Sequence, residues 1–282
     1  MVLIIATVSA LGALTTRADQ AVLSTTPIRD LMPEFVEIAS GPFIMGADPA
    51  RDSSAFDNER WSATGGHGTV DLPTFYISRH EVTVGQFEAF ARGATWTIDP
   101  RARAGTPSHP VSFVSWPDAL AYCRWLEATL KASDETWPVG DRLRAGWRVS
   151  LPSEAQWEKA ARGTAGRRYP WGSEPSRSRA NYEGSGPTPV GQYPCPECPY
   201  GLADMSGNVW EWTRSPYQPY PYDETDDRAN LDADALWVMR GGSFGDTARL
   251  VRTSARGAAD PGARRPFIGF RVVVTPAVTA AR

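Results

Sequence analysis

The residues best suited to chemistry lie in the run 200–213, which reads YGLADMSGNVWEWT. Asp204 precedes a Gly-Asn turn, and Glu211 stands between two tryptophans. Carboxylates and the carbonyls of an irregular loop are oxygen donors, the ligands that hard cations such as Ca²⁺ prefer. The run therefore predicts a tight loop that buries its indole rings while its oxygen atoms converge.

Two further motifs follow, RGGSF at 240–244 and IGFR at 268–271. Read in this order, the three segments resemble the signature of the formylglycine-generating enzyme family, also called sulfatase-modifying factors. More blocks in that family's order extend the resemblance to about residues 33–275. They are FIMG at 43–46, EVT at 81–83, HPV at 109–111, VSW at 114–116, YCRW at 122–125, LPSEAQW at 151–157, YPWG at 169–172 and PVG at 189–191. Each block alone is weakly specific, whereas the ordered set is highly specific.

The resemblance implies a fold similar to that of C-type lectins: an α+β, single mixed domain with little regular secondary structure. The composition agrees, because 24 Pro, 25 Gly and 11 Trp in 282 residues indicate many turns and an aromatic core. We expect a signal peptide at 1–18, a linker at 19–32, the family domain at 33–276 and a tail at 277–282.

The N-terminal residues 2–14 form an apolar run that is too short to span a bilayer. Small residues at plausible cleavage positions follow it, which is typical of a secretory signal peptide, although a basic first region is missing. A buried N-terminal segment or a misplaced start codon is the alternative. We expect a periplasmic or secreted protein without a transmembrane segment. The net charge of −3 gives no electrostatic footprint for nucleic acid.

Periodicity and capping residues predict the elements that position these motifs. Capping boxes at Thr83 and Ser153, and Asp118 in the capping position behind Ser115, each mark the start of a helix, and glycines mark two of the ends. Alternating or β-branched runs predict strands. The expected helices begin at Thr83, Ser115 and Ser153, with Gly93 and Gly163 ending the first and third. The expected strands lie at 33–46, 75–77 and 270–274, and residues 238–239 lead into the Gly-Gly turn.

The resemblance implies a structural calcium site, residue for residue. Its ligands are Asp204, the carbonyls of Gly207 and Val209, and Glu211. The alternative is that the two carboxylates cap turns or pair with arginines. A second calcium site of the family begins at Asn181 and Tyr182, but residues 183–188 form a short stretch that lacks its remaining ligands.

The family's catalytic enzymes oxidise a substrate cysteine to formylglycine, using two cysteines just after the Gly-Gly-Ser turn to bind copper(I). Here residues 244–256 read FGDTARLVRTSAR and contain neither thiol nor imidazole. Because thiolates are the ligands that select copper(I), we expect no copper and assign no catalytic residue. Ser243 in the turn lacks local support for a serine triad.

The three cysteines are expected to be structural. Export would make Cys195 and Cys198 a local disulfide, with a redox pair or a zinc site as alternatives. A zinc site needs two further ligands, and the three histidines are scattered. Cys123 lies on the core-facing stripe of a predicted helix, where an inert packing role is expected.

The roles of four arginines and of one acidic, aromatic loop can each be interpreted in two ways. Arg240, Arg252, Arg256 and Arg271 are expected to serve the fold, with Arg271 pairing with a carboxylate, and anion binding is the alternative. The acidic, aromatic loop 217–227 is either a solvated surface loop or a contact for a peptide.

The sequence favours a family domain that binds a peptide, glycan or protein partner through a lectin-like groove. The alternatives are a periplasmic oxidoreductase of different chemistry, such as siderophore or protein maturation, residual formylglycine-generating activity, or an accessory subunit.

Overall fold

The computed structural model describes residues 32–62, 66–133, 137–223 and 234–277, and the residues from Pro33 onward form one compact unit. The predicted leader, most of the linker and tail, and residues 224–227 of the acidic loop lie outside the described residues. Within the described ranges, no helix is long and apolar enough to cross a membrane. The predicted domain limits stay predictions.

A four-stranded antiparallel sheet joins segments from both ends of this unit. Its strand order is β1 (Phe35–Ile38), β4 (Phe75–Ser78), β10 (Val273–Thr275) and β5 (Arg148–Ser150). The prediction of one strand over 33–46 was wrong, because the chain turns at residues 39–40 and continues as β2 (Gly41–Met45), which pairs with β3 (Gly68–Leu72). Gly41 makes this turn possible with a φ of +123°.

A second four-stranded sheet has the order β8 (Arg256–Ala259), β7 (Trp237–Arg240), β6 (Trp210–Pro216) and β9 (Ile268–Gly269). β9 runs parallel to β6, whereas the other pairs are antiparallel. The sequence predicted a loop where β6 begins. Its first residues read WEWT and alternate apolar and polar side chains, but both faces are buried, so Glu211 lies in the core and does not face solvent.

The expected C-terminal strand 270–274 was wrong at its start, because regular strand begins only at β10 (Val273–Thr275). Residues 270–272 connect β9 of the second sheet to β10 of the first. Arg271 lies at this crossing and is fully buried.

Local side-chain chemistry fixes the starts of the three longer helices, α2 (Val84–Gly93), α3 (Trp116–Ala132) and α5 (Glu154–Arg162). Thr83, Ser115 and Ser153 each accept a hydrogen bond from the amide three residues later, as the capping boxes predict. Gly163 ends α5 with a φ of +66°. Among the described residues, the remaining helical elements are α4 (Gly140–Arg144) and three 3₁₀ turns at Asp57–Glu59, Pro100–Arg103 and Pro199–Gly201.

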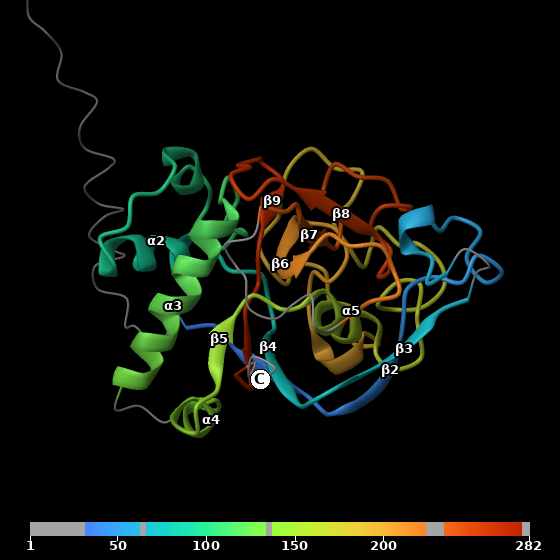
Figure 1. The fold of residues 1–282 in the computed structure, drawn as a ribbon. Helices are drawn as coiled ribbons and strands as arrows, with labels where there is room; N and C mark the ends of the chain where they lie inside the picture. The colour runs from blue at the N-terminus through green and yellow to red at the C-terminus, as the bar shows by residue number, and fades with distance from the viewer. Residues whose placement is uncertain (1–31, 63–65, 134–136, 224–233, 278–282) are drawn as a thin grey trace, which may run out of the picture. The chain divides into compact units, whose positions relative to one another are not determined.

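Helix α5 lies at the centre of the unit, between the β2–β3 hairpin and the β6–β7 pair (Figure 1). Every residue from Glu154 to Arg162 is buried, including its charged side chains. Lys159 Nζ donates to the carbonyls of Ala39 and Gly41, each at 2.8 Å. The helix thereby holds the turn that separates β1 from β2.

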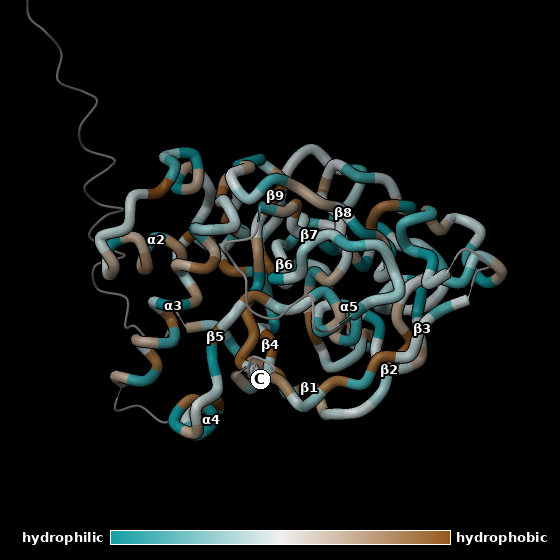
Figure 2. The backbone as a smooth tube through the Cα atoms, in the orientation of Figure 1, coloured by the Kyte–Doolittle hydropathy of each residue, from teal (hydrophilic) through white to brown (hydrophobic). Residues whose placement is uncertain are grey.

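Helices α2 and α3 lie together beside the first sheet (Figure 1). Aromatic rings from both helices pack against one another. The ring of Phe87 lies 5.3 Å from Phe90 and 6.0 Å from Phe270, while Tyr122 lies 5.3 Å from Phe270. Hydrophobic residues lie along β1, β2 and β4 (Figure 2). This mixture of short strands, helices and long loops confirms the predicted α+β single domain.

Candidate functional site

Glu211, the central carboxylate of the predicted calcium set, lies fully buried on β6. Arg271 binds it with two hydrogen bonds, Nε to Oε2 at 2.6 Å and Nη2 to Oε1 at 2.7 Å. Trp157 Nε1 donates to the same Oε2 at 2.7 Å. Both carboxylate oxygens are therefore occupied by protein donors, and the expected pairing of Arg271 with a carboxylate is confirmed.

Asp204 lies beside this pair together with Glu81, a buried carboxylate that was not assigned to the site from the sequence. Glu81 accepts from Asn208 Nδ2 at 2.7 Å and from the amide of Val209 at 3.2 Å. Burial raises the pKa of Glu81 well above its usual range, and the charges of Asp204 and Glu211 raise it further. Burial also raises the pKa of Asp204 to about 6, against the effect of a 2.6 Å hydrogen bond from the Gly191 amide.

The segments that carry the two predicted calcium sites are packed against each other. The amide of Asn208 donates to the carbonyl of Asn181 at 2.8 Å, and Asn181 Nδ2 donates to Asn208 Oδ1 at 3.2 Å. Gly207 allows this approach, because a Cβ there would lie 2.2 Å from the Asn181 carbonyl oxygen. The Tyr182 side chain packs in a small core cluster with Tyr169.

The donor set meets only part of what a calcium ion requires. In the part of the chain that the structure describes, no group of three or more His, Cys, Asp or Glu side chains converges on one point. Glu211 would have to exchange its guanidinium partner for the ion. The local excess of carboxylates over arginines favours a cation, so the calcium assignment of Asp204, Gly207, Val209 and Glu211, and that of Asn181 and Tyr182, stays a prediction.

The turn after β7 is held by a single carboxylate oxygen. Asp246 Oδ2 accepts from the Ser243 hydroxyl at 2.7 Å, from the Ser243 amide at 2.9 Å and from Trp210 Nε1 at 2.8 Å. Gly242 adopts a φ of +70°, and a Cβ there would lie 2.7 Å from Val251 Cγ1. The Ser243 hydroxyl therefore donates to a carboxylate oxygen that also accepts from two other donors and so holds the turn.

The cysteines behave as expected. Cys195 and Cys198 form a disulfide with a Cα–Cα distance of 5.3 Å. Cys123 is buried in α3, and burial raises the pKa of its thiol far above the usual range, which keeps the thiol protonated and inert.

A network of buried arginines and carboxylates surrounds α5. Each guanidinium of the network binds one or two carboxylates in the protein interior. This confirms the expectation that these arginines serve the fold. The pairs are Arg240 with Glu154 and Glu158, Arg252 with Asp52 and Glu59, and Arg256 with Glu154.

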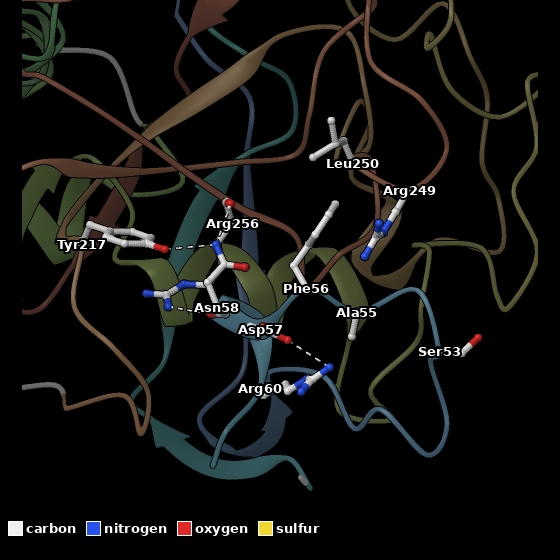
Figure 3. Close-up of a pocket in the computed structure, with 10 residues that line it drawn as sticks. All are labelled: Ser53, Ala55, Phe56, Asp57, Asn58, Arg60, Tyr217, Arg249, Leu250 and Arg256. Carbon is white, nitrogen blue, oxygen red and sulfur yellow. Dashed lines mark hydrogen bonds and ion pairs between the residues drawn. The ribbon is translucent and has the colours of Figure 1, made fainter. Parts of the chain in front are cut away.

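Next to this network the surface opens into a cavity of about 700 Å³ (Figure 3). It lies between the segment around the 3₁₀ turn Asp57–Glu59 and the segments that carry Tyr217, Arg249 and Arg256. Its lining consists of Ser53, Ala55, Phe56, Asp57, Asn58, Arg60, Tyr217, Arg249, Leu250 and Arg256. We call it the arginine cavity.

The arginine cavity was not anticipated from the sequence as a unit. Of its residues, the sequence singled out only Arg256 and Tyr217 of the acidic, aromatic loop. The available signal was a run with several arginines at 249–256 and single aromatic residues in distant segments. Sequence alone does not reveal that these segments meet.

The comparisons with known proteins agree with the fold. The hercynine oxygenase of Mycolicibacterium smegmatis is 31% identical over 284 residues, which cover 84% of this chain and 60% of the relative. The formylglycine-generating enzyme of Streptomyces coelicolor is 37% identical over 205 residues, covering 64% of this chain and 58% of the relative. The chain thus spans about three fifths of the length of these curated relatives.

Among solved structures, PvdO from Pseudomonas aeruginosa matches with a TM-score of 0.69 and 27% identity, covering 87% of this chain and 95% of that chain. Residues 20–276 match the sulfatase-modifying factor enzyme 1-like domain. The matched range includes every strand and helix described above. The mixed single domain is the fold expected for members of this family. The chain belongs to the sulfatase-modifying factor, or formylglycine-generating enzyme, family.

Proposed function

We propose that this chain is an exported ligand-binding member of its family, which holds a peptide, glycan or protein partner in the arginine cavity. The main support for this proposal is an open cavity of about 700 Å³ with an exposed arginine, Arg249, at its edge. Ligand sites of proteins commonly enclose about 300–1,000 Å³ and carry a few well-placed polar groups. The cavity has this size and this mixture of polar and aromatic residues.

Formylglycine generation receives little support from the residues near the Gly-Gly-Ser turn. Residues 244–256 contain no thiol, and the hydroxyl of Ser243 is bound by Asp246. A structural calcium ion and a periplasmic or secreted location belong to the same proposal.

A second candidate is an oxidoreductase of different chemistry. Its support is the relationship to proteins named hercynine oxygenase and PvdO, which share 31% and 27% identity with this chain. A shared fold does not transfer a reaction, because catalytic groups differ among proteins of one fold.

Two experiments test the proposal, one for ligand binding and one for residual formylglycine-generating activity. The purified full chain is applied to peptide and glycan arrays, beside the variants Arg249→Gln and Arg144→Gln. Arg144 is an exposed arginine on α4 whose change removes the same charge elsewhere. Binding that is lost in Arg249→Gln and kept in Arg144→Gln supports the proposal. Equal binding by the wild type and both variants would show that the ligand does not bind in the arginine cavity.

The second experiment is a turnover assay followed by mass spectrometry. The full chain, with and without copper(I), meets oxygen and a Cys-x-Pro-x-Arg peptide, with a cysteine-bearing homologue as the positive control. We expect no loss of thiol mass and no aldehyde. Conversion to the aldehyde would overturn the binding proposal in favour of catalysis.

A further inference from the structure

Each end of the arginine cavity carries a guanidinium stacked on an aromatic ring. The Arg249 Cζ lies 3.7 Å from the ring centre of Phe56, and the Arg256 Cζ lies 5.0 Å from that of Tyr217. In Figure 3, Tyr217 and Arg256 stand at one side, Arg249 at the other, and Asn58 and Phe56 between them. Stacking of this kind holds a guanidinium in place while leaving its edge N–H groups available as donors.

The positive charge of Arg249 has no carboxylate partner among the described residues. Its Nε donates to the carbonyl of Ser54 at 2.7 Å, which is a neutral acceptor. The other cavity arginines are paired, Arg60 with Asp57 at 3.0 Å and Arg256 with a buried glutamate. The attraction of the cavity for an anion is therefore concentrated at Arg249.

Asn58 supplies a second group that a ligand could meet. Its Nδ2 donates to Tyr217 Oη at 3.1 Å and to the Arg256 carbonyl at 3.3 Å. A carbonyl only accepts, so this contact fixes which end of the amide is nitrogen. Asn58 Oδ1 is buried and has no hydrogen-bond partner in the described structure, and in Figure 3 it points toward Phe56. A buried acceptor without a donor is costly, which favours a ligand that brings an N–H or O–H.

The aromatic rings of the cavity argue against a neutral sugar. A sugar ring that binds by stacking needs a free aromatic face. Phe56 already lies against Arg249, and Tyr217 against Arg256. The groups left for a ligand are an unpaired guanidinium and an amide oxygen.

We propose that the arginine cavity binds a short peptide through its free terminal carboxylate. Arg249 pairs with the carboxylate, and Asn58 Oδ1, which is covered in the unliganded chain, accepts an N–H of the peptide backbone once a local shift of the lining exposes it. A peptide satisfies both groups at once, since its carboxylate and its amide N–H groups lie on the same short chain. This inference rests on the proposed function and names the ligand class of that site.

The test is an NMR titration of the isotope-labelled full chain. The probe is a mixture of acetylated tripeptides randomised at all three positions, prepared once as free acids and once as C-terminal amides. The free acids are expected to shift the signals of Phe56, Asn58 and Arg249. The amides should bind roughly 10- to 100-fold more weakly, because the charge-assisted hydrogen bonds are lost. Glucuronate is titrated separately, since it offers a carboxylate on a sugar.

Variants complete the test. Arg249→Gln is expected to bind the acids and the amides equally weakly, while Arg144→Gln keeps the preference of the wild type. Asn58→Asp is expected to weaken the free acids by repulsion without unfolding the chain, which its spectrum checks.

The outcomes separate the inference from the function on which it rests. Acids and amides that shift the cavity signals with equal affinity overturn the carboxylate inference and leave the binding function in place. Stronger binding of glucuronate than of the peptide acids replaces the peptide by an acidic sugar. If neither these probes nor any ligand found on the arrays shifts the cavity signals, both the inference and the proposed function fail.

Discussion

Two regions of the molecule are stabilised by opposite chemistry. Between α2 and α3 the core is aromatic, with Phe87, Phe90 and Tyr122 in mutual contact. Around α5 and the second sheet, the largest fully buried side chains include Arg240, Arg252 and Arg271. The first region gains stability from area removed from water, and the second depends on carboxylates that meet each guanidinium.

The comparison shows where each region tolerates change. Apolar contacts are nondirectional, so a cavity in the helical region lowers stability in proportion to the volume lost. A buried ion pair has a different sensitivity, because removing one member leaves the other charged and without a partner. Substitutions of similar size should therefore separate the two regions.

The largest effect is expected for Arg271→Met, which strands the carboxylate of Glu211 in the core. The free energy of unfolding should fall by about 3–5 kcal/mol in urea titrations. The double variant Arg271→Met/Glu211→Gln should recover part of this loss, because the stranded charge is removed. A double variant no more stable than the single one would show that packing, not charge, dominates here.

Leu126→Ala tests the apolar region, because Leu126 is fully buried in α3. We expect a loss of about 3 kcal/mol, from lost apolar transfer plus an unfilled cavity. Leu126→Met keeps the volume and should cost less than about 1.5 kcal/mol. Equal losses in both variants would contradict the volume argument.

The pH dependence of stability provides a third test in the charged region. Burial raises the pKa of Asp204 from 3.8 to about 6, so the folded state holds the proton to higher pH. Asp204 therefore favours folding fully below pH 3.8, and this contribution falls as the pH rises through 6. Across this window the wild type should lose on the order of 2–3 kcal/mol relative to Asp204→Asn, in urea titrations with EDTA present. Parallel curves for the two proteins would refute the assignment.

Ser153→Ala is expected to have the smallest effect of the four. The Ser153 hydroxyl accepts from the Gln156 amide at 3.1 Å and caps α5. Its loss should cost about 1 kcal/mol, measured as a shift of the urea midpoint. Ser153→Asp restores an acceptor and should recover most of the stability, whereas a cost above that of Leu126→Ala would reverse the ranking of the two regions.

The contrast also explains which features the sequence could predict. Caps such as Thr83 and Ser153 were predicted correctly, because a capping box is complete within four residues. The Cys195–Cys198 disulfide is equally local. β6 and the crossing from β9 to β10 at Arg271 were missed, since they depend on which sheet each residue joins. The arginine cavity was missed for the same reason, because its residues come from segments almost 200 positions apart.

The position of α5 has a consequence for how the chain can acquire its structure. The carboxylates of Glu154 and Glu158 meet Arg240 and Arg256, which are 82–102 residues later in the chain. A helix whose charged groups depend on such distant partners gains little stability until the C-terminal strands have formed. Contacts of long sequence separation slow folding, so we expect this unit to fold slowly and late during synthesis. Fragments that end before Arg240 should be unable to retain α5 as a stable helix.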